Sequence, residues 1–463
     1  MQEVLKPFLQ AHAEELPWPV NAALSPVAPS DNPGRLYDFY RASNEQQVEN
    51  EIRSTLKYSR YSKIAGKEAT AWTEIFVAYW RAVGQILRAE EATNLGRLRG
   101  REMADIYDAW KTMVDLIVRH TTNGNLPPWT VVIMYIAANN LRLLAIKADD
   151  QLAQSKDDDT VKSTFQDDIV STDKRNKKLE EAARVFNKIF SLCLNDRNPD
   201  MGQSRKWGTY YMANLQFRTY FKLKNVSLSK NVVKSIQAQT DLPKFHLFPA
   251  AHRVTYKYYV GVLCFLQEDY PKAEACLTEA WELCLPDSIK NQELILTYLI
   301  PCRLITKHSI PTQALLSSYP NLKRIFGPLV ACIKCGDLSG FDNALVDAED
   351  AFVKRRIYLT LERGRDIALR NLFRKVFLAQ GFEDLKEGQA GTDRIRKSRV
   401  PLSHFTVALR MGLGGEGGQV LEDEEVECML ANMIYKGHMK GYISREHSMV
   451  VLNKKGAFPG TGV

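Results

Sequence analysis

Apolar residues recur at intervals of three and four along most of the chain, from about Leu36 to Leu378. An example is the run Phe76, Tyr79, Trp80, Val83, Ile86 and Leu87. This spacing places apolar side chains on one face of a helix, and the period-two alternation that marks β-strands is scarce here. The pattern therefore predicts one helix after another.

An internal repeat is visible between His252 and Leu285. Gly261 precedes Ala273 by twelve residues, and Leu277 and Ala280 follow at four and then three more. These are tetratricopeptide (TPR) spacings, in which small residues let two antiparallel helices approach closely and a leucine fills the seam between them. The paired segments 179–194 and 207–221 extend the pattern. We expect a right-handed array of helical pairs.

The pattern changes near the end of the chain. An amphipathic helix is predicted over 424–435, after a shorter helix that begins near Pro401. Two short apolar segments, 441–444 and 449–452, then bracket a polar turn. Two helices followed by a hairpin are typical of a winged helix. The predicted fold is therefore all-α: a TPR-like helical-repeat array that ends in a winged helix with a small C-terminal β-hairpin.

Composition divides the chain further. The proline-containing start predicts an irregular segment over 1–35, and a polar stretch predicts a loop or insertion over 155–178. Helical repeats are expected over 36–154 and 179–350, and the winged-helix region over 351–463. Overall, 45% hydrophobic and 25% charged residues exclude a disordered chain.

Cysteine content and hydropathy give expectations about the environment. Eight cysteines in 463 residues are too few for a disulfide framework, which favours a reducing compartment. The sequence shows no signal peptide pattern, and its most apolar window, 129–138, is too short to span a bilayer. Cys332 and Cys335 have the spacing of half a zinc site without a second pair, so no metal is expected.

The positive charge is concentrated near the C-terminus. The formal net charge is +8, and residues 351–463 contain 19 Lys and Arg against 13 Asp and Glu. Such cations can bind the phosphates of RNA or DNA, although a solvated basic face is an open alternative. The candidate nucleic-acid-binding residues are Arg394, Arg396, Lys397, Arg399, Lys436, Lys440, Arg445, Lys454 and Lys455.

Motifs for catalysis are few. Gly412–Gly417 matches the G-x-G-x-x-G pattern, but a dinucleotide site requires a strand before the loop, and here a helix is predicted. The acidic residues 422–425 after the loop would also repel phosphate. The sequence contains no nucleophile elbow, Walker loop or zinc-protease motif. We expect a protein without enzymatic activity or cofactor; a nucleotide-binding enzyme that uses this loop is the alternative.

Three segments resemble the PCI-domain family, which is named for the proteasome lid, the signalosome and initiation factor. They are His252–Gly261, Arg370–Val376 and Leu430–Ser444. The resemblance runs from about Trp207 to Pro459. Within the family, the chain is similar to the branch that contains the PCI subunit of the nuclear transcription and mRNA-export complex and its fungal signalosome-associated relative.

The resemblance implies a non-catalytic, hetero-oligomeric subunit that is nuclear, or both nuclear and cytoplasmic. It implies pairing through the winged helix with a larger PCI scaffold protein, binding of a small disordered acidic protein shared with the proteasome lid, and a nucleic-acid-binding face, with no membrane partner. A purely structural subunit of a lid- or signalosome-type complex is the alternative. The candidate partner-binding residues are Arg253, Tyr256, Lys257, Tyr258, Arg374, Lys375, Met449, Val450, Val451 and Leu452. Core packing is an open alternative for the tyrosines.

Overall fold

The computed structural model describes residues 2–61, 64, 66–160, 176–383, 396–413 and 422–463. Its contacts divide the chain into two compact units, Met1–Tyr259 and Val260–Val463, each of which is described separately. The described residues are mainly helical, and they include one small three-stranded sheet. The predicted all-α class is confirmed.

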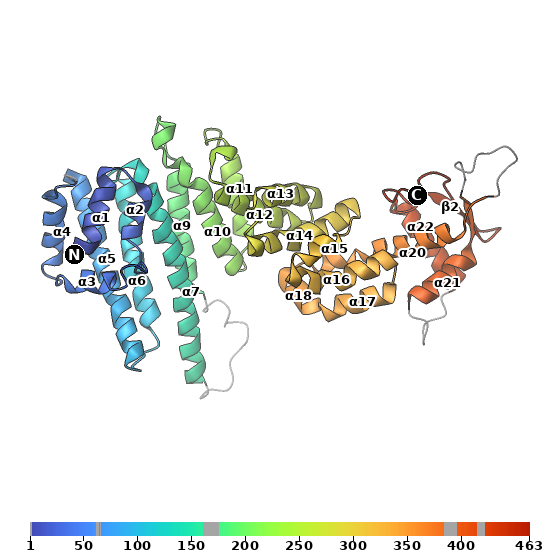
Figure 1. Cartoon of the computed structure of the whole chain (residues 1–463), viewed down its shortest axis with the longest axis horizontal. Helices are drawn as coiled ribbons and strands as arrows, with labels where there is room; N and C mark the ends of the chain where they lie inside the picture. Colours follow the sequence, from blue (N-terminus) through green and yellow to red (C-terminus); the bar gives the residue numbers. More distant parts are fainter. Residues whose placement is uncertain (1, 62–63, 65, 161–175, 384–395, 414–421) are drawn as a thin grey trace. The chain divides into compact units, whose positions relative to one another are not determined.

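The first unit is a series of packed helices around an aromatic core. Trp72, Tyr79, Tyr107 and Trp110 are completely buried, and the Trp110 indole N–H donates to the carbonyl of Ala137 at 3.0 Å. Figure 1 shows α5, α6, α7 and α9 lying side by side, each in contact with the next. The helices are α1 (Gln2–Ala13), α2 (Pro17–Ala23), α3 (Arg35–Arg41), α4 (Val48–Lys57), α5 (Gly66–Asn94), α6 (Glu102–Thr122), α7 (Ile133–Thr160), α9 (Lys177–Leu194), α10 (Thr209–Lys222), α11 (Ser227–Gln237) and α12 (Ala250–Leu266), which continues into the second unit.

Residues 1–35 differ from the irregular segment expected from their prolines, because α1 and α2 occupy much of this range. Val4, Leu5 and Phe8 of α1 are buried, and the Phe8 ring meets Trp72 edge-on at 4.7 Å. Pro17 begins α2, where the missing N–H costs no helical hydrogen bond. The prolines thus mark a helix start, and the buried face of α1 anchors the segment to the core.

The predicted loop at 155–178 is shorter than expected on both sides. Helix α7 continues to Thr160, and α9 begins at Lys177. Asp149 of α7 accepts the backbone N–H groups of Lys178 and Leu179 at 3.0 Å, so a carboxylate from another helix satisfies the first turn of α9. The intervening residues 161–175 lie outside the described residues.

One segment among the described residues, Pro128–Ser155, is long and apolar enough to cross a membrane by length and composition. Half of that window is buried inside the structure, where α7 packs against α6 and α9. The most apolar window of the sequence, 129–138, ends at two asparagines. Helix α7 extends further because apolar residues continue beyond these asparagines.

The second unit contains the predicted repeat and the winged helix. Its elements after α12 are α13 (Tyr270–Leu283), α14 (Ile289–Lys307), α15 (Gln313–Ser317), α16 (Pro320–Cys335), α17 (Leu338–Asp347), α18 (Glu349–Arg355), α19 (Tyr358–Glu362), α20 (Arg365–Ala379), β1 (Arg399–Pro401), α21 (Leu402–Gly412), α22 (Asp423–Tyr435), β2 (Gly441–Ser444) and β3 (Met449–Leu452). A Cβ on Gly261 would lie 2.7 Å from the Leu277 side chain. The close helix approach predicted for this pair is therefore present.

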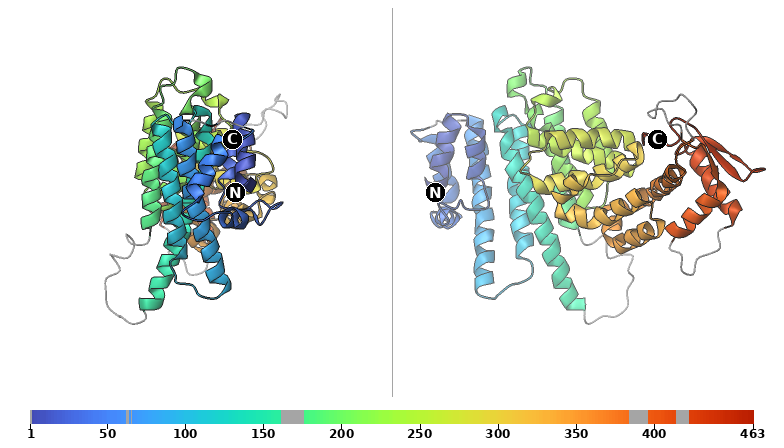
Figure 2. Two further views of the ribbon diagram at one scale, coloured as in Figure 1. Left: turned by 90° about the vertical axis from the view of Figure 1, so that its left-hand side faces the viewer. Right: turned by 45° about the vertical axis from the view of Figure 1, so that its right-hand side comes forward.

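The sheet has the strand order β1-β3-β2, and all pairs are antiparallel. The hairpin of β2 and β3 was predicted, whereas β1 was not. In the right-hand view of Figure 2 the strands lie beside α21 and α22, which contact β1 and β2, respectively. Val400, Val450 and Leu452 are buried beneath the sheet. This arrangement matches the predicted winged helix and adds a third strand to it.

Candidate nucleic-acid and partner interface

The register of the sheet brings separate basic residues to one end. Gly441 pairs with Leu452 and Arg399 pairs with Val451, so the starts of β1 and β2 meet the end of β3. The backbone continues this pairing: Asn453 donates to the Lys440 carbonyl at 3.0 Å, and Leu452 donates to the Ser398 carbonyl at 2.8 Å. We call the side chains gathered there the sheet-end cluster: Lys397, Arg399, Lys440, Lys454 and Lys455.

Four members of the sheet-end cluster carry uncompensated charge. Lys397, Arg399, Lys440 and Lys455 are exposed, and none is within ion-pair distance of a described carboxylate. Within the cluster, only Lys454 has a described carboxylate partner: its Nζ lies 4.0 Å from the Oε1 of Glu383. Exposed cations that keep their donors free are suited to phosphate groups, which accept several hydrogen bonds each.

The other predicted nucleic-acid residues are placed differently. Lys436 pairs with Asp366 of α20 at 2.6 Å, and Arg445 pairs with Glu427 of α22 at 2.5 Å. The hydrogen bond to Glu427 raises the pKa of Arg445 above its ordinary value. The guanidinium of Arg396 lies 4.5 Å from the centre of the Phe382 ring. Arg394 lies outside the described residues.

The strand β3 has one buried face and one outward face. Met449 and Val451 are partly exposed, while Val450 and Leu452 are 0% and 2% exposed. Alternation along a strand explains this split, because adjacent side chains point to opposite faces of a sheet. The structure therefore removes Val450 and Leu452 from the expected contact surface and leaves Met449 and Val451 on it.

The residues predicted on α12 lie mostly against the first unit's core. Tyr256 is 7% exposed, and its ring meets Tyr210 edge-on at 4.8 Å. The Lys257 ammonium lies 5.1 Å from the centre of the Phe245 ring. Tyr258 and Arg253 are half-buried, and the shielded Arg253 Nε has no hydrogen-bond partner within the described ranges. Tyr256 is thus a core residue, as the packing alternative for the tyrosines allowed.

Arg374 and Lys375 are neighbours on α20 with different surroundings. Lys375 is exposed, but its ammonium donates to the Cys335 carbonyl at 2.9 Å, at the C-terminal end of α16. This contact satisfies a carbonyl that has no partner within the helix. Arg374 is half-buried, and none of the described residues accepts a hydrogen bond from its Nε.

The surroundings of the glycine-rich segment differ from those of a dinucleotide site. Helix α21 precedes it and ends at Gly412, where a strand would be required. Glu422 and Glu425 form a capping box at the start of α22, so their carboxylates occupy the N–H groups that could hold a phosphate. Gly414–Gly417 lie outside the described residues.

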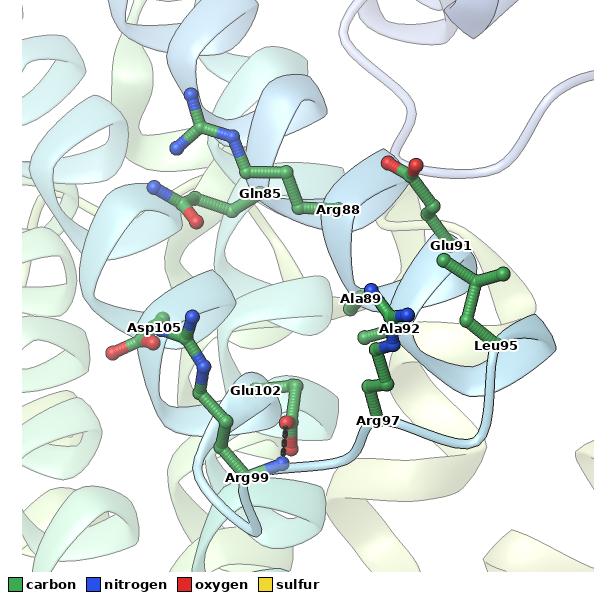
Figure 3. A pocket seen from close by; sticks show the side chains of 10 residues that line it. All are labelled: Gln85, Arg88, Ala89, Glu91, Ala92, Leu95, Arg97, Arg99, Glu102 and Asp105. Carbon is green, nitrogen blue, oxygen red and sulfur yellow. Dashed lines mark hydrogen bonds between the residues drawn. The ribbon is translucent and has the colours of Figure 1, made fainter.

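A hollow of about 540 Å³ lies between the end of α5 and the start of α6 (Figure 3). Its lining mixes arginines and carboxylates, including Arg88, Arg97, Arg99 and Glu102. Burial opposes the charged form of Glu102, but backbone N–H groups led by that of Arg99, together with the Gln151 amide, hold its pKa below the ordinary value. Glu102 is therefore engaged as a local cap, and the hollow contains no histidine or cysteine. Within the described parts of the chain, no cluster of metal-binding side chains is found.

Comparison with known proteins identifies the family. The PCI domain model matches residues 343–454, which cover the end of the repeat and the winged helix. The chain is 45% identical over its full length to the full-length "Protein CSN12 homolog" of Neurospora crassa, and equally so to that of Gibberella zeae. The chain belongs to the PCI-domain family of CSN12 homologues.

A second group of PCI-domain relatives extends the likeness beyond fungi. The "PCI domain-containing protein 2" of Xenopus laevis is 32% identical over 72% of this chain and 73% of its own length. The PCI match contains all the candidate nucleic-acid-binding residues except Lys455. The resemblance inferred from the residue motifs is thus confirmed for the family.

Two exposed aromatic residues in the PCI region were not predicted as candidates. Tyr442 of β2 is 63% exposed and stands in register with Val451, across β3 from Arg399. Tyr435, at the end of α22, is 90% exposed. The alternation in Gly441–Ser444 could have indicated Tyr442, because the next residue, Ile443, is apolar and stands in register with the buried Val450. Arg399, Val451 and Tyr442 form one outward row across the sheet.

Proposed function

We propose that this chain is a non-catalytic PCI subunit that contributes a nucleic-acid-binding face to a complex in transcription-coupled mRNA processing or nuclear export. It pairs through the outward face of its sheet with a larger PCI-domain protein, binds a small acidic protein, and acts in the nucleus. The observation that carries the nucleic-acid role is the sheet-end cluster. It gathers exposed cations at and beside the ends of three strands, and four of them lack a described carboxylate partner.

The arrangement favours phosphate contacts over base recognition. Lysine and arginine side chains on a surface bind the nucleic-acid backbone and release counterions, which makes affinity fall with salt. Tyr442, two strands from Arg399, adds an aromatic ring on which an unpaired base can stack. The partner surface would use Met449 and Val451 on the same outward face.

The nucleic-acid role is tested by comparing two charge-reversal variants of equal size. One replaces Lys397 and Lys440 with glutamate, and its matched control replaces Lys436 and Arg445, which are ion-paired. Binding of single-stranded RNA is measured across a salt series with the assembled complex. We expect the first variant to lose affinity and to reduce the salt slope by about one for each phosphate contact removed. Equal binding by the first variant and the wild type would contradict the proposal.

A purely structural subunit is the second candidate, favoured by the ion pairs that neutralise Lys436 and Arg445 within the chain. This candidate predicts that both charge variants assemble normally and that neither changes RNA binding. Val451→Glu tests the pairing with a PCI-domain partner, which both candidates share, because it places charge on the outward face of β3. We expect that variant to fold and to lose the larger PCI partner in co-purification, whereas retained partner would contradict pairing through this face.

A further inference from the structure

Arg370 is a deeply buried arginine on α20. Arg370 is 5% exposed, and its Nε is shielded from solvent and finds no hydrogen-bond partner among the described residues. Among the described carboxylates, none lies within ion-pair distance of its guanidinium. Since an arginine stays charged, a shielded Nε–H donor without an acceptor is costly.

The neighbouring charges on α20 are already engaged. Arg365 forms a two-pronged contact with Asp342 at 2.9 Å, and Lys375 donates to a carbonyl at the end of α16. Asp366, one turn before Arg370, takes Lys436 at 2.6 Å. Arg365 and Lys375 are therefore engaged elsewhere, and the carboxylate of Asp366 is already paired with Lys436.

Three further side chains interact electrostatically with this arginine, one from the same helix and two from other parts of the unit. Arg374 lies one turn along α20, and its shielded Nε likewise has no partner in the described part of the chain. His308, after α14, and His438, after α22, approach with ring centres 4.7 Å apart, and no described group forms a hydrogen bond with the His438 Nδ1. We call these four residues the Arg370 cluster: Arg370, Arg374, His308 and His438.

The cluster is electrostatically unbalanced. Burial, and then the charge of Arg374, lower the pKa of Arg370. Burial also lowers the pKa of both histidines, and Arg370 adds to the effect in each case. Asp366 opposes the shift at His438, while Lys436 reinforces it. Each described influence on Arg370 therefore disfavours its positive charge, and a bound anion would reverse this.

We propose that the Arg370 cluster binds a carboxylate side chain carried by an acidic polypeptide. This inference deepens the proposed function and rests on the acidic partner included there. A carboxylate is planar and accepts two parallel N–H groups from one guanidinium, which suits a single deeply placed arginine. A nucleic-acid phosphate carries sugars on both sides, so it fits the exposed sheet-end cluster better than a group that is 5% exposed.

Thermal unfolding of the full chain without ligand provides the first test. We expect Arg370→Met to raise the midpoint, because it replaces an unpaired buried charge with an apolar chain of similar length. An arginine that serves only the fold would lower the midpoint when replaced. A lower midpoint would therefore overturn the inference. Lys397→Met, at an exposed cation, is the matched control and should leave the midpoint unchanged.

Binding provides the second test and uses the wild-type chain. A short oligoglutamate peptide is titrated while the arginine Nε–H and histidine ring signals are followed by NMR. We expect the Arg370 and Arg374 signals to move and the pKa of His438 to rise on binding. Arg370→Met should weaken the peptide about tenfold to a hundredfold, since hydrogen bonds to charged groups are of that strength. The affinity of Arg370→Lys for the peptide should lie between those of the wild type and Arg370→Met, because lysine keeps the charge and lacks the paired donors.

Two outcomes would overturn the inference. If oligouridylate or inorganic phosphate moves the Arg370 signals and oligoglutamate does not, the cluster belongs to a phosphate site. If no ligand moves them, water alone satisfies the donors. Either failure is distinguishable from failure of the proposed nucleic-acid role, because the latter is measured by RNA binding of the Lys397 and Lys440 variant, outside the Arg370 cluster.

Discussion

Helix α12 and strand β3 were both predicted to contact partners, and they differ in how much surface they offer. On α12, the Tyr256 ring packs against Tyr210 and Phe217 of α10. On β3, every second side chain faces outward and the intervening ones are buried. A helix within an array has neighbours on several sides, whereas a sheet packed on one face leaves a whole face free. The family motif on α12 therefore contributes mainly to packing, and the contact candidates remain on β3.

The contrast is sharpest within β3 itself. Val450→Asp places an unpaired carboxylate in a fully buried position and should lower the free energy of unfolding by at least about 4 kcal/mol. Val451→Asp, one residue later, should leave folding almost unchanged and abolish pairing with the partner. Urea unfolding and co-purification measure the two effects. Equal stability of the two variants would contradict the assigned faces of the strand.

The same comparison can be made on α12 with two tyrosines that are two residues apart. Tyr256→Ala removes a ring that contacts Tyr210, Phe217 and Phe245, and should cost about 3 kcal/mol of stability. Tyr258→Ala removes a half-buried ring and should cost less, about 1 kcal/mol. Chemical denaturation of both variants provides the measurement. A larger loss of stability for Tyr258→Ala than for Tyr256→Ala would contradict the assignment of Tyr256 to the core.

Sequence periodicity predicted the helices, the Gly261–Leu277 seam and the hairpin, because each depends on local spacing. It missed β1, since three residues are too short to show alternation and the pairing of Arg399 with Val451 is distant in sequence. It also missed the Arg370 cluster. The segment 370–376 resembles the PCI-domain family in sequence, but only the fold brings His308 and His438 close to it. Burial and pairing of charges depend on such distant contacts.

Packing of the α12 motif also predicts sensitivity to acid. Burial lowers the pKa of His252 to about 4, against 6.5 for an exposed imidazole. The folded state thus resists protonation that the unfolded state accepts, so stability is complete above pH 6.5 and falls as the pH drops toward 4. Near pH 5 the loss should be about 2 kcal/mol.

Urea unfolding near pH 7 and pH 5 measures the effect of His252. We expect His252→Gln to flatten the difference in stability between the two pH values. His246→Gln, at an exposed histidine before α12, is the control and should keep the wild-type slope. An unchanged slope in the His252 variant would assign the acid sensitivity to another group.

The smallest expected effect concerns Lys375, which is exposed like the sheet-end cations but is engaged by the fold. Lys375→Met removes the donor to the Cys335 carbonyl and a positive charge at the end of α16, and should cost about 0.5–1 kcal/mol. Lys455→Met, at an exposed lysine without a described carboxylate partner, should cost nothing measurable in the same urea titration. Association with the PCI partner should survive Lys375→Met, because its ammonium is occupied within the chain. If Lys375→Met instead lost the partner at unchanged stability, Lys375 would belong to the contact surface. Its exposure, and not its hydrogen bond to the end of α16, would then determine its role.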